Sequence, residues 1–197
     1  MALEPLSKEE LIVISNQDFL LTKNKALEKI YQILVRVKNH LEPLVTKNKS
    51  IFPKELKTSH AKISKGENYK QLPYVVLDYP AVFHHENIFA YRSMFWWGHY
   101  FSATLHLQGA YLEAYRDALI DHLSSLTDHP LYVAVGESPW EYHYDSSNYL
   151  PLEDTHGKLL VTHPFIKLSI KSDLSEWKSF PKLAYQTFSL FLEAIGT

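Results

Sequence analysis

The chain has 197 residues, of which 46% are hydrophobic and 21% are charged, and its formal net charge is -2. This length and composition are typical of one globular domain and exclude a disordered or fibrous protein. Because no concentrated basic patch is visible, we expect no nucleic-acid partner. The chain contains no cysteine, which excludes disulfides, thiolate catalysis, iron–sulfur clusters and cysteine-based zinc sites.

The sequence carries no signal for a membrane or for export. No apolar run approaches the roughly 18–20 residues that a membrane helix requires. The first ten residues lack both the basic region and the apolar core of a signal peptide. We therefore expect a cytoplasmic protein with no membrane partner.

The first part of the chain, about residues 7–45, is predicted to be helical. Ser7 with Glu10 three residues later forms a capping-box pattern that opens a short helix. A longer helix is predicted from residue 22 or 24 onward, and Pro43 should end it near residue 41. Its apolar stripe consists of Leu27, Ile30, Tyr31, Leu34, Val37 and Leu41.

A polar, lysine-containing segment follows at about residues 46–71. Its lysines are spread rather than clustered, and Pro53 and Gly66 interrupt any regular pattern. We interpret it as a solvated loop in preference to a phosphate-binding surface.

From about residue 72 to 197 the pattern predicts strands and helices. The expected strands are 74–77, a hairpin over 88–107, 131–135, 140–144, 159–161 and 165–170, with helices at 110–126 and from Pro181 to the end. Strands grouped in runs indicate an α+β fold with a mostly antiparallel sheet. We predict a single α+β domain over residues 1–197, with five or six strands and helices mainly on one face.

The central hairpin carries the strongest candidate for a binding residue. A two-residue turn at Trp97-Gly98 would pair Trp96 with His99 and place Arg92 opposite Ala103. One face would then be apolar apart from a single charge; it would consist of Ile88, Ala90, Arg92, Met94, Trp96, His99, Phe101, Ala103, Leu105 and Leu107. A buried arginine requires a partner, so Arg92 should form an ion pair, extend to water or contact an anionic ligand. Asp78 and Glu86 are the candidate ion-pair partners, and an error in the register is the remaining explanation.

The other face of the hairpin would be aromatic and hydroxyl-rich. It would contain Phe89, Tyr91, Ser93, Phe95, Tyr100, Ser102, Thr104 and His106. A covering helix is the plainest explanation for such a face. A ligand pocket and a subunit interface are the alternatives.

Eleven histidines raise the question of a metal site. Glu141, His143 and Asp145 would share a side of an extended segment and could recruit His156 or His163. A chance arrangement explains this pattern better, and no metal ligand is assigned. The sequence contains no metalloprotease, phosphate-loop or dinucleotide motif, so catalytic residues and cofactors stay unknown.

Three functional hypotheses remain, and whether the protein is an enzyme stays open. The first is binding of a small polar or anionic ligand near the hairpin; its candidate residues are Arg92, Tyr74, Tyr91, Tyr100, His106, Trp96 and Trp97. In the register above Arg92 and the pair Tyr91 and His106 lie on opposite faces, so these candidates compete. The second is a non-catalytic interaction protein whose aromatic face forms a homodimer or partner interface. The third is a metal-dependent enzyme with histidine and carboxylate ligands.

Overall fold

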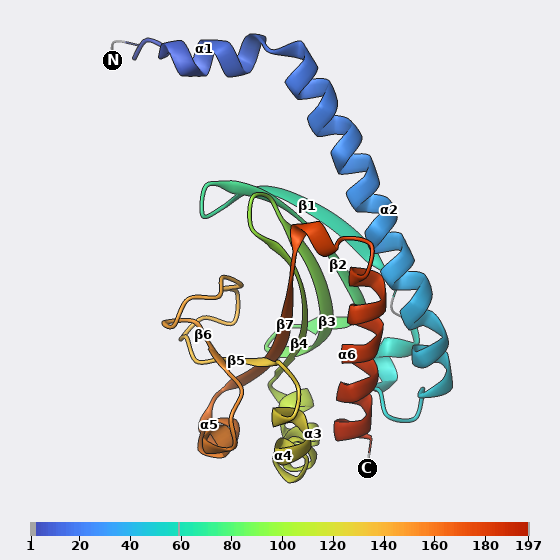
Figure 1. Cartoon of the computed structure of the whole chain (residues 1–197). Helices are drawn as coiled ribbons and strands as arrows, with labels where there is room; N and C mark the ends of the chain where they lie inside the picture. Colours follow the sequence, from blue (N-terminus) through green and yellow to red (C-terminus); the bar gives the residue numbers. More distant parts are fainter. Residues whose placement is uncertain (1–2, 59, 197) are drawn as a thin grey trace.

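A single antiparallel sheet forms the centre of the computed structural model, which describes residues 3–58 and 60–196. Within that part of the chain the strands are β1 Lys62–Tyr69, β2 Leu72–His84, β3 Asn87–Trp96, β4 Tyr100–Gln108, β5 Tyr132–Ala134, β6 Tyr149–Pro151 and β7 Phe165–Asp173. Their order in the sheet is β1-β2-β3-β4-β7-β5-β6 (Figure 1). The predicted α+β class and antiparallel sheet are confirmed, with seven strands rather than five or six.

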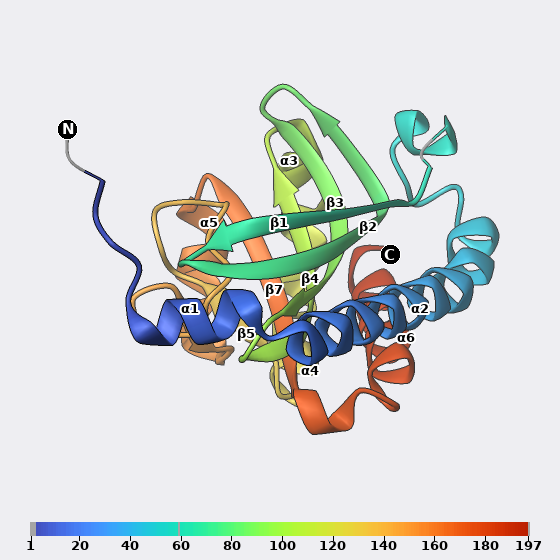
Figure 2. The same cartoon turned by 90° about the horizontal axis from the view of Figure 1, so that it is seen from above.

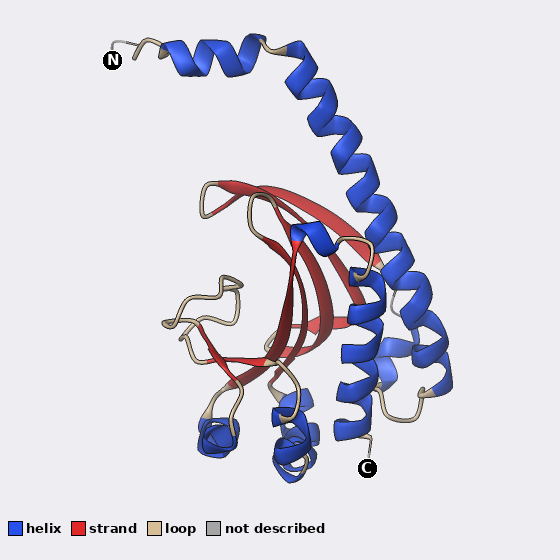
Figure 3. Ribbon diagram, in the orientation of Figure 1, coloured by secondary structure: helices blue, strands red, loops and turns tan. Residues whose placement is uncertain are grey.

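The long helices lie against one face of this sheet. The helices are α1 Lys8–Ser15, α2 Gln17–Lys47, α3 Ala110–Asp121, α4 Leu123–Thr127, α5 Gly157–Thr162 and α6 Phe180–Ile195, with short 3-10 turns at Lys54–Thr58, Asp154–His156 and Leu174–Glu176. Figure 3 shows α6 and the lower part of α2 side by side to the right of the strands, which confirms the prediction that helices cover mainly one face. Among the described helices, none combines the length and apolar character needed to cross a membrane.

Alternate residues of the strands build the core beneath these helices. Phe89 and Tyr91 of β3, Leu105 of β4 and Leu168 of β7 are completely buried there. Phe188 of α6 packs against Tyr91 with ring centroids 4.7 Å apart. Burial of each apolar side chain of this kind stabilises the folded state by about 1.5–3 kcal/mol, so the helix-covered face supplies much of the stability of the fold.

The opposite face of the sheet is concave and is covered by a chain segment without regular structure. We call residues 135–148, which connect β5 to β6, the strap. In Figure 1 the strap lies on the side of the sheet away from α2 and α6. The side chains beneath it are polar or aromatic, among them Arg92, Thr104, His106, Lys167 and Ser169.

The predicted register of the central hairpin is wrong by one residue. β3 and β4 pair Trp96 with Tyr100 and Arg92 with Thr104, so the turn contains three residues rather than two. Gly98 sits in this turn with a φ of 73°, which suits the left-handed position of a three-residue loop. Because side chains alternate, the shift moves every β4 residue to the other face relative to β3. Arg92 and His106 therefore share one face.

The second helix does not end before Pro43 as predicted. α2 continues to Lys47 with Pro43 inside it. Leu44 and Val45, which follow the proline, pack against the core. Tertiary contacts thus hold the last turn in place although the proline removes one backbone hydrogen bond.

The predicted loop over residues 46–71 contains a strand. Its second half forms β1, which pairs with β2 at the edge of the sheet, joining Ile63 to Leu77. Lysines are common on edge strands because they discourage pairing with another chain, and here they hid the strand pattern. β2 is also longer than predicted: it passes Pro80 through an irregularity between Asp78 and Ala81, where a sheet tolerates proline.

Two further strand predictions are wrong. Residues 140–144 belong to the strap and form no strand, while residues 159–161 lie in the helix α5. Both segments are short, and a short apolar run does not distinguish a strand from a buried helix turn. The predicted helix over 110–126 is divided into α3 and α4 at His122.

Candidate functional site

A cleft on the concave face is lined by polar and aromatic side chains, among them the buried Asp78 and the partly buried Arg92. Its volume is about 510 Å³. The lining residues come from β1, β2, β3, the strap and the residues just before β1. They are His60, Lys62, Ser64, Tyr74, Val76, Asp78, Ala81, Phe83, Arg92 and Trp140. This volume lies within the usual range for small-molecule sites.

Arg92 is held at the floor of this cleft by a two-pronged ion pair. Its Nε donates to Oδ1 of Asp78 at 2.7 Å and its Nη2 to Oδ2 at 2.9 Å. Its Nη1 donates to the hydroxyl of Tyr142 at 2.8 Å. Burial disfavours the charge, but Tyr142 and Asp78 outweigh burial, so the pKa of Arg92 is raised and the guanidinium stays protonated. The prediction that Arg92 pairs with Asp78 or Glu86 is confirmed for Asp78.

Two N–H groups of Arg92 remain for a ligand. A guanidinium carries five N–H donors, and bonds to the described residues use three of them. The fixed plane of the guanidinium suits a carboxylate or a phosphate, which accept two parallel hydrogen bonds. Asp78 thus fixes the orientation of the guanidinium.

The strap is fastened to the sheet by tyrosine hydroxyls. The hydroxyl of Tyr69 accepts the N–H groups of Tyr142 and His143 and donates to Glu141 at 2.8 Å. The hydroxyl of Tyr100 donates to the carbonyl of Tyr142 at 3.1 Å. Burial raises the pKa of Tyr142 to about 12, so it remains a neutral donor and acceptor.

A fully buried lysine lies under the strap. The Nζ of Lys167 on β7 donates to the backbone carbonyl of Glu141 and lies 3.7 Å from the centre of the Tyr142 ring. Burial and the nearby charge of Arg92 lower the pKa of this amine far below its ordinary value. The amine therefore loses its charge more easily than a surface lysine does.

His106 on β4 lies next to Lys167, its pairing partner across the strands. Its ring is buried, and its Nε2 has no hydrogen-bond partner among the described residues. The ring of Trp140 covers it at a centroid distance of 5.7 Å. Burial, with the neighbouring Lys167, lowers the pKa of His106 to about 3, so the ring is neutral at pH 7. Trp140 therefore both contacts the ring of His106 and lines the cleft.

The seven predicted binding residues fall into three groups. Arg92 and Tyr74 line the cleft. Tyr100, His106 and Trp96 lie on the same concave face but under the strap or packed against their neighbours. The expected competition between Arg92 and His106 was therefore wrong, because the corrected register brings them to one face. Tyr91 and Trp97, by contrast, are directed toward the helix-covered core.

Tyr91 shows why the predicted aromatic face does not exist as one surface. Its hydroxyl donates to the carbonyl of Ala184 on α6 at 2.6 Å, and the residue is 0% exposed. Phe89 and Phe95 are likewise buried under the helices, whereas Tyr100 and His106 face the strap. The residues suggested for a homodimer or partner interface are thus divided between the interior under the helices and the face beneath the strap, and whether the chain forms a homodimer stays a prediction.

Sequence reasoning missed several residues of the site. Lys167 and Ser169 alternate with apolar residues along β7, which indicates a shared face but not its burial. Trp140 and Tyr142 lie in the segment predicted to be a strand, and nothing in the sequence indicated that this segment crosses the concave face. Lys62 was assigned to a loop.

The expected grouping of Glu141, His143 and Asp145 is present. His143 lies between the two carboxylates, 3.0 Å from Glu141 and 3.1 Å from Asp145. These contacts occupy both ring nitrogens. Among the described residues no group of three or more such side chains has the arrangement of a metal site.

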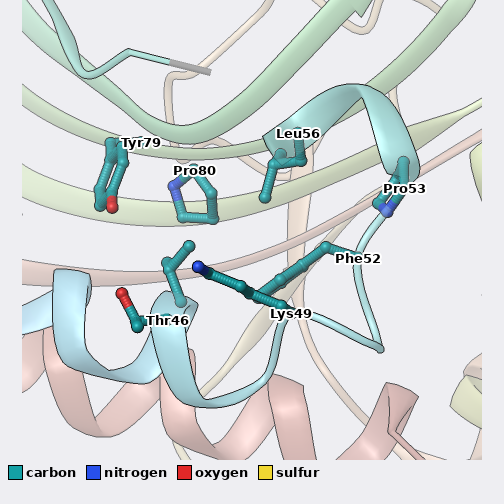
Figure 4. A pocket seen from close by; sticks show the side chains of 8 residues that line it. Thr46, Lys49, Phe52, Pro53, Leu56, Tyr79 and Pro80 are labelled. Carbon is teal, nitrogen blue, oxygen red and sulfur yellow. The ribbon is translucent and has the colours of Figure 1, made fainter. Parts of the chain in front are cut away.

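A second cavity lies between the end of α2 and strand β2. Figure 4 shows Lys49 extending past Phe52 toward Pro80, with Leu56 and Tyr79 on the far side. Its volume is about 130 Å³ and its lining is mixed, polar and apolar. It is too small for an organic ligand of ordinary size, so the concave cleft is the better candidate.

Comparisons with protein-family models, with curated proteins and with solved structures find no match. The functional argument therefore rests on the geometry and chemistry of the chain itself.

Proposed function

We propose that the protein binds a small organic anion in the concave cleft, with Arg92 as the anchor for its carboxylate or phosphate group. The observation that carries the proposal is the orientation of Arg92 by Asp78, which leaves two N–H donors for a ligand. Buried arginine donors are costly without partners, and an anion would supply both.

The charges and rings of the cleft support a ligand of this class. Lys62 and Arg92 outnumber Asp78 among the charged groups of the described lining. Tyr74, Phe83 and Trp140 provide aromatic surface on its walls, which favours a ligand that also carries a ring. We therefore propose aromatic carboxylates and phosphorylated ring compounds as the first classes to test.

The test is a thermal-shift screen of the purified chain with inorganic phosphate, simple carboxylates and a panel of aromatic acids. A ligand at 100 times its dissociation constant adds about 2.7 kcal/mol of stability. For a chain of this size we expect a rise in the melting temperature of roughly 5–10 °C. Calorimetry would then give the dissociation constant of each hit.

Two cleft variants and a matched control make the test specific. Arg92→Met should abolish the shift, although it also breaks the pair with Asp78. Lys62→Met changes an exposed residue of the rim, so it should weaken binding without changing the free energy of unfolding. Arg36→Met removes an exposed arginine of α2 and should leave binding intact. A hit that both cleft variants bind as tightly as the unchanged chain would contradict the proposal.

A further inference from the structure

Residues 3–22 form an apolar arm that no other part of the described chain covers. Residues 3–22 are all classed as exposed. Nine of the fifteen strongly exposed large apolar side chains in the described part of the chain lie here: Leu3, Leu6, Leu11, Ile12, Val13, Ile14, Phe19, Leu20 and Leu21. In Figure 1, α1 and the first turns of α2 extend beyond the end of the sheet. We call residues 3–22 the arm.

The arm has the properties of a defined structure. Ser7 caps α1 through a complete capping box, and the side chain of Asn16 accepts the N–H of Phe19 at the start of α2. Both helices therefore have satisfied amino-terminal ends. Figure 2 shows them following one another along the outside of the molecule.

The arm also continues the stripe that attaches α2 to the domain. Ile30 and Leu34 are buried in the core, and Leu27 packs against it one turn earlier. Leu20 lies at the next heptad position before Leu27, where two turns of helix return to the same face. The side of α2 that is buried along the domain thus stays apolar after the domain ends.

We propose that a second copy of this chain covers the arm, in a two-fold dimer in which each arm packs on the other subunit. With about 200 Å² for a fully exposed side chain of this size, the nine residues expose on the order of 1,000 Å². Monomers rarely expose so large an apolar patch. It is about the area that one partner contributes to a standard protein interface.

The chain itself carries a groove suited to receive such an arm. Ile30, Phe95, Phe101, Leu174 and Trp177 line a depression of about 190 Å³ beside the point where α2 leaves the domain. Trp177 is 43% exposed at its rim. In a two-fold dimer each chain must carry both of the complementary patches. This chain carries both the arm and the groove, and the two lie next to each other.

The charges of the arm favour a protein partner over a membrane. The arm contains one lysine, Lys8, and four carboxylates, which are Glu4, Glu9, Glu10 and Asp18. Helices that lie on membranes usually carry an excess of lysine and arginine on their polar side. An arm with an excess of carboxylates instead suits the groove of a second chain, whose lining includes Lys29.

The first test is the mass of the full chain in solution. Sedimentation at micromolar concentration should give twice the 22.9 kDa of one chain. Ile12→Glu combined with Phe19→Glu should raise the dimer dissociation constant by about 100-fold or more. Val161→Glu changes an equally exposed apolar residue on α5 and should leave the dimer intact. A chain that is monomeric at high micromolar concentration overturns the proposal, as does equal weakening by the control.

Cross-linking tests the contact itself, since the chain has no cysteine of its own. Phe19→Cys and Trp177→Cys chains are mixed and treated with a short bis-maleimide. We expect a cross-linked pair containing one chain of each kind. Trp140→Cys, exposed to a similar degree on the concave face, is the control and should give at least tenfold less product. Equal yields with both partners would overturn the docking of the arm in the groove.

A flotation assay separates a membrane occupant from a second copy. Vesicles of neutral and of anionic phospholipid are mixed with the full chain and with the Ile12→Glu, Phe19→Glu variant. The dimer should stay with the soluble fraction in every case. Arm-dependent flotation would assign the arm to a lipid surface and overturn the dimer.

Discussion

Both faces of the sheet carry buried side chains, but these side chains are apolar on one face and largely polar or aromatic on the other. On the helix-covered face Phe89, Leu105 and Leu168 pack among apolar neighbours. On the concave face His106 and Lys167 are just as inaccessible, yet they meet the strap rather than a helix. Burial of apolar side chains stabilises the fold. Burial of polar side chains that lack hydrogen-bond partners does not, so their presence on the concave face needs a different explanation.

That difference indicates where a ligand would act. A protein seldom keeps buried polar groups unpaired unless a function needs them, because each costs about 1–3 kcal/mol. The unpaired Nε2 of His106 and the unused donors of Arg92 both belong to the concave face. On the helix-covered face the hydroxyl of Ser93 also lacks a partner among the described residues. Four predictions test this contrast, from the largest expected effect to the smallest.

The largest effect is expected in the helix-covered core. Phe188→Ala should lower the free energy of unfolding by about 3–5 kcal/mol, because it leaves a cavity against Tyr91 and Phe52. Urea denaturation measures the change. Tyr185→Ala, partly exposed on the same helix, is the control and should cost clearly less. Equal losses would show that α6 is not anchored through Phe188.

The second prediction concerns the ion pair of the concave face. Asp78→Ala should cost about 2–4 kcal/mol, since it leaves the mostly buried Arg92 without its carboxylate. Adding Arg92→Met should restore part of that loss. Glu42→Ala breaks the exposed pair with Lys38 and should cost less than about 1 kcal/mol. If the double variant is less stable than Asp78→Ala, the loss does not arise from leaving the charge of Arg92 without its carboxylate.

The third prediction is a pH dependence that arises at His106. Its pKa is lowered to about 3 in the folded chain, mainly by burial, whereas an unfolded histidine has a pKa of about 6.5. As the pH falls below 6.5 the unfolded state gains a proton that the folded state does not bind, so stability decreases toward pH 3.

Between pH 7.5 and pH 5 this group should remove about 2 kcal/mol of stability. The His106→Asn variant should not show this loss of stability between the two pH values. The His129→Asn variant, changed at an exposed position, should still show it. Urea denaturation at the two pH values measures both. If the free energy of unfolding changes equally with pH in the unchanged chain and in His106→Asn, His106 is not buried as a neutral ring.

The smallest effect compares two hydroxyls on one strand. Tyr91→Phe removes the bond to Ala184 and should cost about 1 kcal/mol. Ser93→Ala, two residues further and equally buried, removes a hydroxyl that has no partner among the described residues. It should be neutral or slightly stabilising. If Ser93→Ala lowers the free energy of unfolding more than Tyr91→Phe does, the hydroxyl of Ser93 has a hydrogen-bond partner.

The fold class could be predicted because its signals are local. The helical spacing from Leu27 to Leu41, the proline at the start of α6 and the alternation along β7 each depend on residues close in the chain. The wrong predictions arose where distant contacts decided the outcome. Pro43 stays helical because the residues after it pack against the core, and β1 is a strand because β2 pairs with it.

The candidate site could be predicted only in part. Arg92 stands out as a charge in an apolar strand, and Asp78 was one of two expected partners. The position of Tyr100 and His106 depended on the turn at Gly98, since one additional turn residue reverses the faces of β4. Composition and alternation do not distinguish a two-residue from a three-residue loop at this position.

The sequence by itself determined that this chain forms an antiparallel sheet with amphipathic helices and that Arg92 would need a partner. Only the tertiary structure decided which side of the sheet the helices cover and that the strap encloses Lys167 and His106. The physical reason is that periodicity records the two faces of a strand but not what is packed against each of them. Burial of a polar group is a property of its distant neighbours, and those are brought together only by folding.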